Sequence, residues 1–285
     1  MKSILITGGT GFFGRSFIKA LLDRKLCDRI CIYSRDEYKQ HQLRKLFNND
    51  KRLRYFIGDV RDKERLTRAM RHVDVVIHAA ALKRIEVGHY NPDEMTKTNV
   101  IGSMNVIEAA EANNADRVVF LSTDKAFQPV SAYGHSKALA ESLFIAANSM
   151  YGPDATKFAV TRYGNVAGST GSIIPAWREI LTNGAVVPVT DPECTRFFMM
   201  PWQAVNLVLS TLQLMCDDSF DFSKPVIPRL PAFKVGDLAE AMGAEMHVTG
   251  LPSWEKMHES MDHGNSSDLA EQMSVKELEA ALHEI

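Results

Sequence analysis

The chain has 285 residues, of which 45% are hydrophobic and 24% charged, a balance typical of a soluble globular protein with one large domain or two smaller ones. Lys and Arg total 33 against 35 Asp and Glu, which argues against nucleic acid as a partner, because binding by charge requires a basic surface. The apolar runs are too short for a membrane helix, and the first breaks into glycines too early for a signal peptide, so we expect a cytoplasmic protein with no membrane partner.

The first half of the chain alternates short apolar runs with longer segments of helical periodicity. The apolar runs cover residues 3–6, 30–33, 55–57, 73–77 and 117–121, and the helical segments cover 15–25, 91–113 and 132–150. Asn91 and Pro92 suit the start of the second helix, because Asn caps helices and Pro fits their first turn. Continuous apolar strands separated by helices predict an α/β fold with a doubly wound, Rossmann-type parallel sheet.

After about residue 165 the pattern changes. Eight of the 11 prolines lie there, and they separate helical segments at 201–215, 235–241 and 275–283. We interpret residues 1–166 as a Rossmann domain and residues 167–285 as a smaller substrate-binding lobe, from which some segments return to the first domain. The lobe is expected over the C-terminal edge of the sheet, where open α/β folds bind ligands.

A glycine-rich loop connects the first strand to the first helix and contains the G-x-G-x-x-G spacing. Glycines let the backbone approach a pyrophosphate, and the helix N-terminus supplies free amides. We predict a dinucleotide site here, with a ligand-free glycine turn as the alternative. The predicted contacts are Gly8, Thr10, Gly11, Phe12, Phe13 and Gly14.

The end of the second strand indicates which dinucleotide binds. Ser34 and Arg35 stand about 20 residues beyond the loop, where an NAD enzyme carries an acid. A hydroxyl and a guanidinium suit a 2′-phosphate and therefore favour NADP, and Asp36 is interpreted as the cap of the next helix. Asp59, after the third strand, is either an acceptor for the adenine amine or a plain helix cap.

Tyr133 and Lys137 lie four residues apart, on one face of a predicted helix. A lysine ammonium there lowers the pKa of the phenol, so that Tyr133 can accept a sugar hydroxyl proton while a hydride passes to the cofactor. The Tyr-x-x-x-Lys spacing occurs often by chance. Its position after the fifth strand, beyond Thr123, Asp124 and Lys125, gives it weight.

These motifs resemble those of the extended short-chain dehydrogenases/reductases, and more narrowly of the UDP-N-acetylglucosamine 4,6-dehydratases of the polysaccharide-biosynthesis group. The resemblance spans residues 4 to about 200. It rests on Tyr33-Ser34-Arg35-Asp36, His78-Ala79-Ala80-Ala81-Leu82-Lys83, Lys97-Thr98-Asn99-Val100, Ser122-Thr123-Asp124-Lys125-Ala126, Tyr133-Gly134-His135-Ser136-Lys137, Arg162-Tyr163-Gly164-Asn165-Val166 and Thr195-Arg196-Phe197. It implies a tightly bound NADP, regenerated in each cycle. It also implies further cofactor contacts from Val60, Ala79, Ala80, Ala81, Tyr133 and Lys137.

The resemblance implies a 4,6-dehydratase that oxidises carbon 4 of a UDP-sugar, eliminates water across carbons 5 and 6, and returns the hydride to carbon 6. Our hypothesis is that Lys125, kept partly neutral by its surroundings, removes the carbon-5 proton. Protonated Asp124, next to Thr123, then donates to the leaving 6-hydroxyl. A strand-end ion pair is the structural alternative. Tyr133 favours inversion at carbon 5, because retaining members of the family often carry Met there.

The resemblance also assigns four residues to the substrate. Lys83 and Asn99 stand where the family lines the sugar and orders the active-site helix, and Asn165 matches an asparagine that contacts the diphosphate. Arg196 matches a basic residue near the same phosphates, or is a plain surface arginine. An arginine of the family is missing near residues 251–252, which leaves the identity of the nucleotide sugar open.

Two other functions are compatible with the same features. A UDP-sugar 4-epimerase or 4-reductase shares the Tyr–Lys pair and the cofactor, and a non-catalytic NADP-binding sensor shares the fold. The helices predicted at 91–113 and 132–150 resemble those of the family's dimer interface, so we expect a homo-oligomer.

The cysteines and histidines match no metal motif. Cys27, Cys31, Cys194 and Cys216 follow neither zinc nor redox spacings, and the nine histidines do not cluster with acids. We predict no metal site and interpret the cysteines as free thiols, buried or half-buried.

Overall fold

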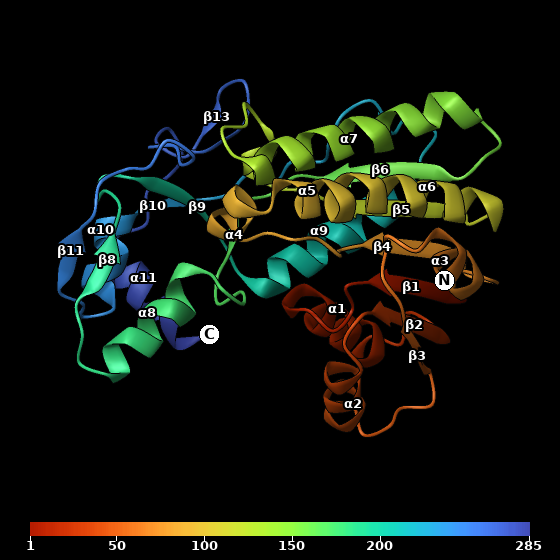
Figure 1. The fold of residues 1–285 in the computed structure, drawn as a ribbon, viewed down its shortest axis with the longest axis horizontal. Helices are drawn as coiled ribbons and strands as arrows, with labels where there is room; N and C mark the ends of the chain where they lie inside the picture. Colours follow the sequence, from red (N-terminus) through yellow and green to blue (C-terminus); the bar gives the residue numbers. More distant parts are fainter.

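Six parallel strands form the central sheet of the computed structural model, which describes residues 1–285 (Figure 1). Their spatial order is β3-β2-β1-β4-β5-β6, the doubly wound order that the sequence predicts. The strands are β1 (Ser3–Thr7), β2 (Arg29–Ser34), β3 (Leu53–Ile57), β4 (Val75–His78), β5 (Arg117–Leu121) and β6 (Lys157–Thr161). The sixth was not predicted, because its five residues include only two large apolar side chains, Phe158 and Val160.

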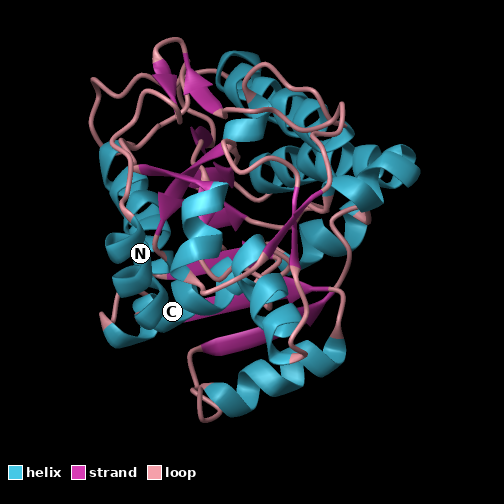
Figure 2. Ribbon diagram, turned by 90° about the vertical axis from the view of Figure 1, so that its left-hand side faces the viewer, coloured by secondary structure: helices cyan, strands magenta, loops and turns pink.

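Helices cover both faces of this sheet (Figure 2). On one face lie α1 (Phe12–Asp23), α2 (Glu37–Leu46) and α9 (Pro201–Leu214), packed on alternate strand residues such as Ile4 and Ile6. On the other lie α3 (Lys63–Ala69), α6 (Gly102–Ala112) and α7 (Ala132–Tyr151), packed on the intervening residues such as Leu5. Because both faces of β1, β2, β4 and β5 are buried, these strands give the continuous apolar runs in the sequence, whereas β3 at the edge is only partly buried.

The helix predicted at 91–113 is divided into three segments. It consists of α5 (Pro92–Met95), the π-helical turn η1 (Thr96–Ile101) and α6, and it follows α4 (Ile85–Tyr90). Asn91 and Pro92 stand at the start of α5 as predicted, but the Asn91 side chain makes no capping bond, and its amide donates to the Val87 carbonyl of the preceding helix. Wide π turns inside helices are frequent at functional sites, and this one lies beside α7. The structure contains no helix with the length and apolarity that a membrane crossing requires.

The C-terminal part forms a lobe at one end of the sheet, on the left of Figure 1. Its elements are β7 (Asn165–Val166), α8 (Ile173–Thr182), β8 (Val187–Val189), β9 (Thr195–Met199), β10 (Ala232–Lys234), α10 (Val235–Ala241), β11 (Met246–Val248), β12 (Ser260–Asp262), β13 (Asn265–Ser266) and α11 (Val275–His283). A separate apolar core around Trp177, Phe198 and Phe233 holds the lobe together. By contrast, α9 packs on α1 and shares the core of the large sheet. A domain boundary at residue 166 stays a prediction.

Three of the four cysteines are free and buried, as expected: Cys27, Cys31 and Cys194. The prediction is wrong for Cys216, which is exposed. It lies just beyond the end of α9, where its thiol faces the Arg117 guanidinium.

Candidate active site

The glycine-rich loop turns back on itself between β1 and α1. The Gly11 amide donates to the Gly8 carbonyl at 2.8 Å, and the Gly8 amide donates to Tyr33 of β2 at 2.8 Å. Gly11 is the N-terminal cap of α1, and the first helical hydrogen bond runs from the Arg15 amide to the Gly11 carbonyl. The amides of the intervening residues 12–14 therefore remain available to an anion at the positive end of the helix.

Two glycines make this loop close-packed. A Cβ added at Gly14 would lie 2.4 Å from the Gly9 carbonyl oxygen, and one added at Gly8 would lie 2.9 Å from the Ala80 Cα, so neither position has room for a side chain. The Ala80 amide also donates to Thr7 Oγ1 at 3.2 Å, so the loops after β1 and β4 are in direct contact. A backbone cradle at the point where the strand order reverses fits the pyrophosphate of a dinucleotide.

An exposed cation follows the end of the second strand. Arg35 has 56% of its side chain exposed and lies 3.7 Å from Asp59. Ser34 is buried, and its hydroxyl accepts a hydrogen bond from Gln40 at 3.0 Å. Asp36 caps α2 by accepting from the Lys39 amide at 3.0 Å, which confirms that prediction.

Asp59 is not a helix cap, so that alternative is wrong. The cap of α3 is Asp62, which accepts from the Arg65 amide at 2.9 Å, because the helix begins at Lys63 and not earlier. The Asp59 carboxylate binds the Arg61 guanidinium at 2.8 Å and 3.0 Å. Burial raises the pKa of Asp59, but its bonds with Arg61 outweigh burial and hold that pKa below its ordinary value. Val60 next to it offers its carbonyl to Asn105.

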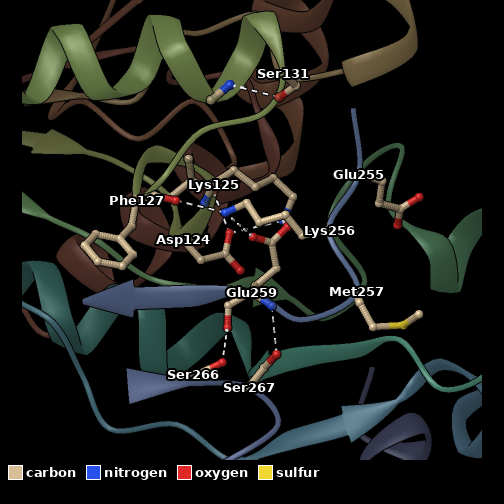
Figure 3. Close-up of polar contacts among 12 residues, drawn as sticks. Asp124, Lys125, Phe127, Ser131, Glu255, Lys256, Met257, Glu259, Ser266 and Ser267 are labelled. Carbon is tan, nitrogen blue, oxygen red and sulfur yellow. Dashed lines mark hydrogen bonds and ion pairs between the residues drawn. The ribbon is translucent and has the colours of Figure 1, made fainter. Parts of the chain in front are cut away.

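The turn after β5 holds the acid–base pair. This 3₁₀ turn, η2 (Asp124–Ala126), brings Asp124 Oδ1 within 3.1 Å of Lys125 Nζ, while Thr123 Oγ1 donates to the same oxygen at 2.9 Å (Figure 3). Asp124 is completely buried, and its second oxygen, Oδ2, has no partner. The carboxyl therefore has one oxygen free to reach a ligand.

The protonation of this pair differs in part from the hypothesis. Burial raises the pKa of Asp124, as a proton donor requires. Burial alone lowers the pKa of Lys125, but the Asp124 and Glu259 carboxylates outweigh it and hold that pKa above its ordinary value. The prediction of a partly neutral Lys125 is therefore wrong for this resting arrangement, because two carboxylates face its ammonium.

The first turn of α7 packs directly on η2. Ser131 caps the helix by accepting from the Gly134 amide at 3.1 Å, and a Cβ at Gly134 lies only 2.4 Å from the Lys125 carbonyl oxygen. Glycine at this position lets Tyr133 approach Thr123. Burial raises the pKa of Tyr133 to about 12, although the Lys125 ammonium and a hydrogen bond with Thr123 act in the opposite direction.

Lys137 lies below Tyr133 on α7 but points to the sheet. Its Nζ donates to the Leu121 carbonyl at 2.6 Å and lies 3.9 Å from the centre of the Phe120 ring. Burial lowers the pKa of Lys137 to about 7. The Lys125 ammonium lowers the pKa of the Tyr133 phenol, and the same effect from Lys137 stays a prediction.

Asn99 has no polar atom left for a substrate. Its side-chain amide donates to the Leu82 carbonyl and to Ser136 Oγ, both at 2.9 Å, and its Oδ1 accepts from the Leu82 amide at 2.8 Å. It thereby joins η1, the loop after β4 and α7. Lys83, from the same loop, is exposed, and its Nζ lies 3.4 Å from Ser169 Oγ of the loop after β7.

Asn165 lies in β7 and Arg196 in β9, two strands of the lobe that pair in parallel. Asn165 has a buried, unpartnered Oδ1. Arg196 is 6% exposed, so its reading as a surface arginine is wrong. Its guanidinium donates to the carbonyls of Thr195 and Met257 and binds Glu255, because β9 lies beneath the segment 255–259.

A second carboxylate faces Lys125, and no local sequence pattern points to it. Glu259 Oε1 lies 3.3 Å from Lys125 Nζ, and Glu259 Oε2 lies 3.0 Å from Lys256 Nζ. Only the tertiary fold brings these residues to η2, since the segment that carries them belongs to the far end of the chain. In Figure 3 the Glu259 carboxylate lies between the two lysines, and Glu255 points away.

Comparison with known proteins gives consistent results. A family model described as polysaccharide biosynthesis protein matches residues 4–279. The UDP-N-acetylglucosamine 4,6-dehydratase (inverting) of Campylobacter jejuni is 45% identical over 271 residues, which cover 94% of this chain and 79% of that protein. The structure of Pen from Bacillus thuringiensis has a TM-score of 0.93 at 31% identity and covers 100% of this chain and 98% of that one. DesIV, a dTDP-glucose 4,6-dehydratase from Streptomyces venezuelae with NAD and TYD bound, shares the fold, with a TM-score of 0.81 at 21% identity over 99% of this chain and 96% of that one.

Proposed function

Because the chain belongs to the polysaccharide biosynthesis protein family, we propose that it is a UDP-N-acetylglucosamine 4,6-dehydratase that inverts carbon 5. The observation that carries this assignment is the buried Asp124–Lys125 pair, packed against Tyr133 at the carboxyl edge of a sheet with a dinucleotide cradle. An epimerase has no use for an acid beside a base at this position, because it eliminates no water. The relative's name supports the substrate and the inversion.

Oxidation at carbon 4 requires a base for the hydroxyl proton, and Tyr133 is positioned for this role. When bound, a nicotinamide cofactor would supply the acceptor for the carbon-4 hydride and the donor of the hydride that carbon 6 receives. The Tyr133 phenolate, which the Lys125 ammonium stabilises, accepts the hydroxyl proton and becomes a phenol. Thr123 donates to Asp124 and holds that carboxyl in place beside the phenol.

Elimination requires a neutral amine and a protonated acid. One proton passing from Lys125 to Asp124 across their 3.1 Å contact produces both, without changing the net charge of the buried pair. Lys125 then takes the carbon-5 proton, the electron pair forms the carbon 5–carbon 6 double bond, and the 6-hydroxyl leaves as water with the Asp124 proton. The ion pair is thereby restored at the end of the step. A proton added at carbon 5, together with a hydride at carbon 6, completes the 6-deoxy-4-keto product.

The cofactor we propose is NADP. Supporting this, Arg35 is exposed at the end of β2, and the nearby carboxylates of Asp36 and Asp59 are each engaged by other groups. A guanidinium favours a 2′-phosphate, which a free carboxylate there would repel. The amides of residues 12–14 are proposed to hold the pyrophosphate, and the loop of Ala79–Ala81 to line the same cradle.

The diphosphate of the substrate is proposed to lie between the sheet and the lobe. Lys83 offers an ammonium from the loop after β4, and Asn165 offers its side-chain amide from β7. Arg196 contributes there only if it exchanges Glu255 for a phosphate, because its guanidinium is otherwise engaged. We also propose a homo-oligomer, built on the outer surfaces of η1, α6 and α7.

The decisive experiment is incubation of the purified protein with UDP-N-acetylglucosamine and NADP. Mass spectrometry is expected to show the loss of one water, and proton NMR is expected to show a 6-methyl group in place of the 6-hydroxymethyl. An epimerase or reductase keeps the 6-hydroxymethyl, and a non-catalytic binding protein yields no product. Either result would overturn the proposal.

A further inference from the structure

The segment that carries Glu259 crosses from the lobe to the catalytic turn. Glu259 directly precedes β12, and its backbone is anchored on both sides by Ser267. The Glu259 amide donates to Ser267 Oγ at 2.9 Å (Figure 3). The Ser267 amide donates in return to the Glu259 carbonyl at 2.7 Å. The side chain is 2% exposed. Both its position and its direction are therefore fixed by the fold.

Four charged side chains form an alternating row at this point: Asp124, Lys125, Glu259 and Lys256. The successive contacts measure 3.1 Å, 3.3 Å and 3.0 Å. Lys256 is held in turn by the Phe127 carbonyl, to which its Nζ donates at 2.9 Å. A buried carboxylate that only stabilised the lobe would need one cation, and Glu259 has that cation in Lys256. Its second contact is with the amine of the reacting pair.

The charges that face Lys125 come from several elements. Asp124 belongs to its own turn, Glu259 to the segment before β12, Arg196 to β9 and Lys83 to the loop after β4. The Tyr133 phenol faces it from α7. Two carboxylates lie within 3.3 Å of its ammonium, and the remaining charged groups are cations.

We propose that Glu259 is a positioning residue which, through its carboxylate charge and its contact with Lys125, sets the proton occupancy of the Asp124–Lys125 pair, with Lys256 as the opposing charge. This inference rests on the proposed function. For elimination, Asp124 and Lys125 must share a single titratable proton. With two protons Lys125 is an ammonium and cannot act as the base, and with none Asp124 is a carboxylate and cannot act as the acid. A negative charge at 3.3 Å keeps the pair from losing its proton as the pH rises.

The test is the pH profile of turnover in the wild type, three variants of this row and one control variant. With UDP-N-acetylglucosamine deuterated at carbon 5, the primary isotope effect identifies the pH range in which elimination limits the rate. Relative to the wild type, Glu259→Gln is expected to displace both limbs of the profile to lower pH by about one to three units, the usual effect of a charge at this range. Lys256→Met is expected to displace them to higher pH, and Glu259→Asp, which keeps the charge, to leave them near the wild-type position.

Damage to the fold would not shift the pH profile to lower pH in Glu259→Gln and to higher pH in Lys256→Met. Thermal unfolding of each variant measures any such damage separately. Glu193→Gln is the matched control, because that glutamate pairs with Lys234 on the surface of the same lobe. If the wild type turns over and the profiles of Glu259→Gln and Lys256→Met coincide with it, the inference is wrong. If the wild type forms no 6-deoxy-4-keto product, the proposed function fails instead.

Discussion

The amine of Lys137 is buried against a single carbonyl and an aromatic ring, and this environment governs its charge. Its pKa of about 7 in the folded protein lies below the ordinary 10.5, so between these values the unfolded chain binds more protons than the folded one. Stability contributed by this residue must then rise with pH over that window, by at most about 1.4 kcal/mol per pH unit. Below pH 7 Lys137 is protonated in both the folded and the unfolded state. The cost of burying its charge then lowers the free energy of unfolding by a constant amount.

The measurement is urea unfolding of the cofactor-free protein and of Lys137→Met at several pH values from 7 to 10. Other groups titrate in this range, but they titrate in both proteins, so the difference between the two free energies isolates residue 137. We expect the wild type to gain stability relative to the variant as the pH rises. A difference that stays constant from pH 7 to 10 contradicts the lowered pKa.

A substitution of the single residue Arg35 tests whether the protein binds NADP in preference to NAD. Its side chain is exposed and only loosely paired with Asp59, so it is free to bind a 2′-phosphate. A hydrogen bond to a charged group contributes about 1.5–3 kcal/mol, so Arg35→Ala should weaken NADP binding by roughly 10- to 100-fold. The affinity for NAD, which has no 2′-phosphate, is the internal control and should change little. Equal losses for both cofactors in a calorimetric titration would refute the assignment.

At the scale of elements, the approach of α7 to η2 depends on one missing side chain. A Cβ at Gly134 lies 2.4 Å from the Lys125 carbonyl oxygen and 3.0 Å from Pro129 Cβ, and a backbone oxygen cannot move without moving η2. Gly134→Ala should therefore lower kcat at least tenfold, with a loss of about 1–3 kcal/mol in unfolding free energy. The exposed neighbour His135, changed to Ala, should retain full activity. Normal kcat in Gly134→Ala would show that the spacing between Tyr133 and Lys125 tolerates displacement.

The elements that the sequence predicts well are those whose signal is local. Apolar strands buried on both faces and helices with clear starts, such as α10 and α11, lie where periodicity places them. The interruption at η1 carries no local signal, because its wide turn is stabilised by tertiary bonds from Asn99 to Leu82 and Ser136. Asn91 shows the same limit. Its side chain bonds to the Val87 carbonyl of α4, the helix before it, and not to the first turn of α5, and the local sequence does not indicate this choice.

At the scale of the whole molecule, the candidate site combines residues that local motifs can predict with residues that they cannot. The glycine loop, the turn after β5 and Tyr133 follow strands, and the parallel order of the strands places all three at one edge. Glu259 and Lys256 come from a segment whose path the helical and strand periodicities do not determine. The Glu259 carboxylate adds to that of Asp124 in holding the pKa of Lys125 above its ordinary value, and local motifs do not reveal this second carboxylate.

Assembly is the remaining property of the whole molecule, and its prediction rests on the surface of η1, α6 and α7. Ile101, Met104 and Leu139 are 43%, 38% and 51% exposed on these neighbouring helices. A twofold interface uses the same surface from both copies, so one substitution introduces two charges into it. Leu139→Glu should therefore shift the species seen by sedimentation equilibrium from oligomer to monomer. Leu214→Glu, on α9 at the opposite face of the sheet, should leave the assembly unchanged. A wild-type protein that sediments as a monomer, or a Leu139→Glu variant that stays oligomeric, excludes this surface as the interface.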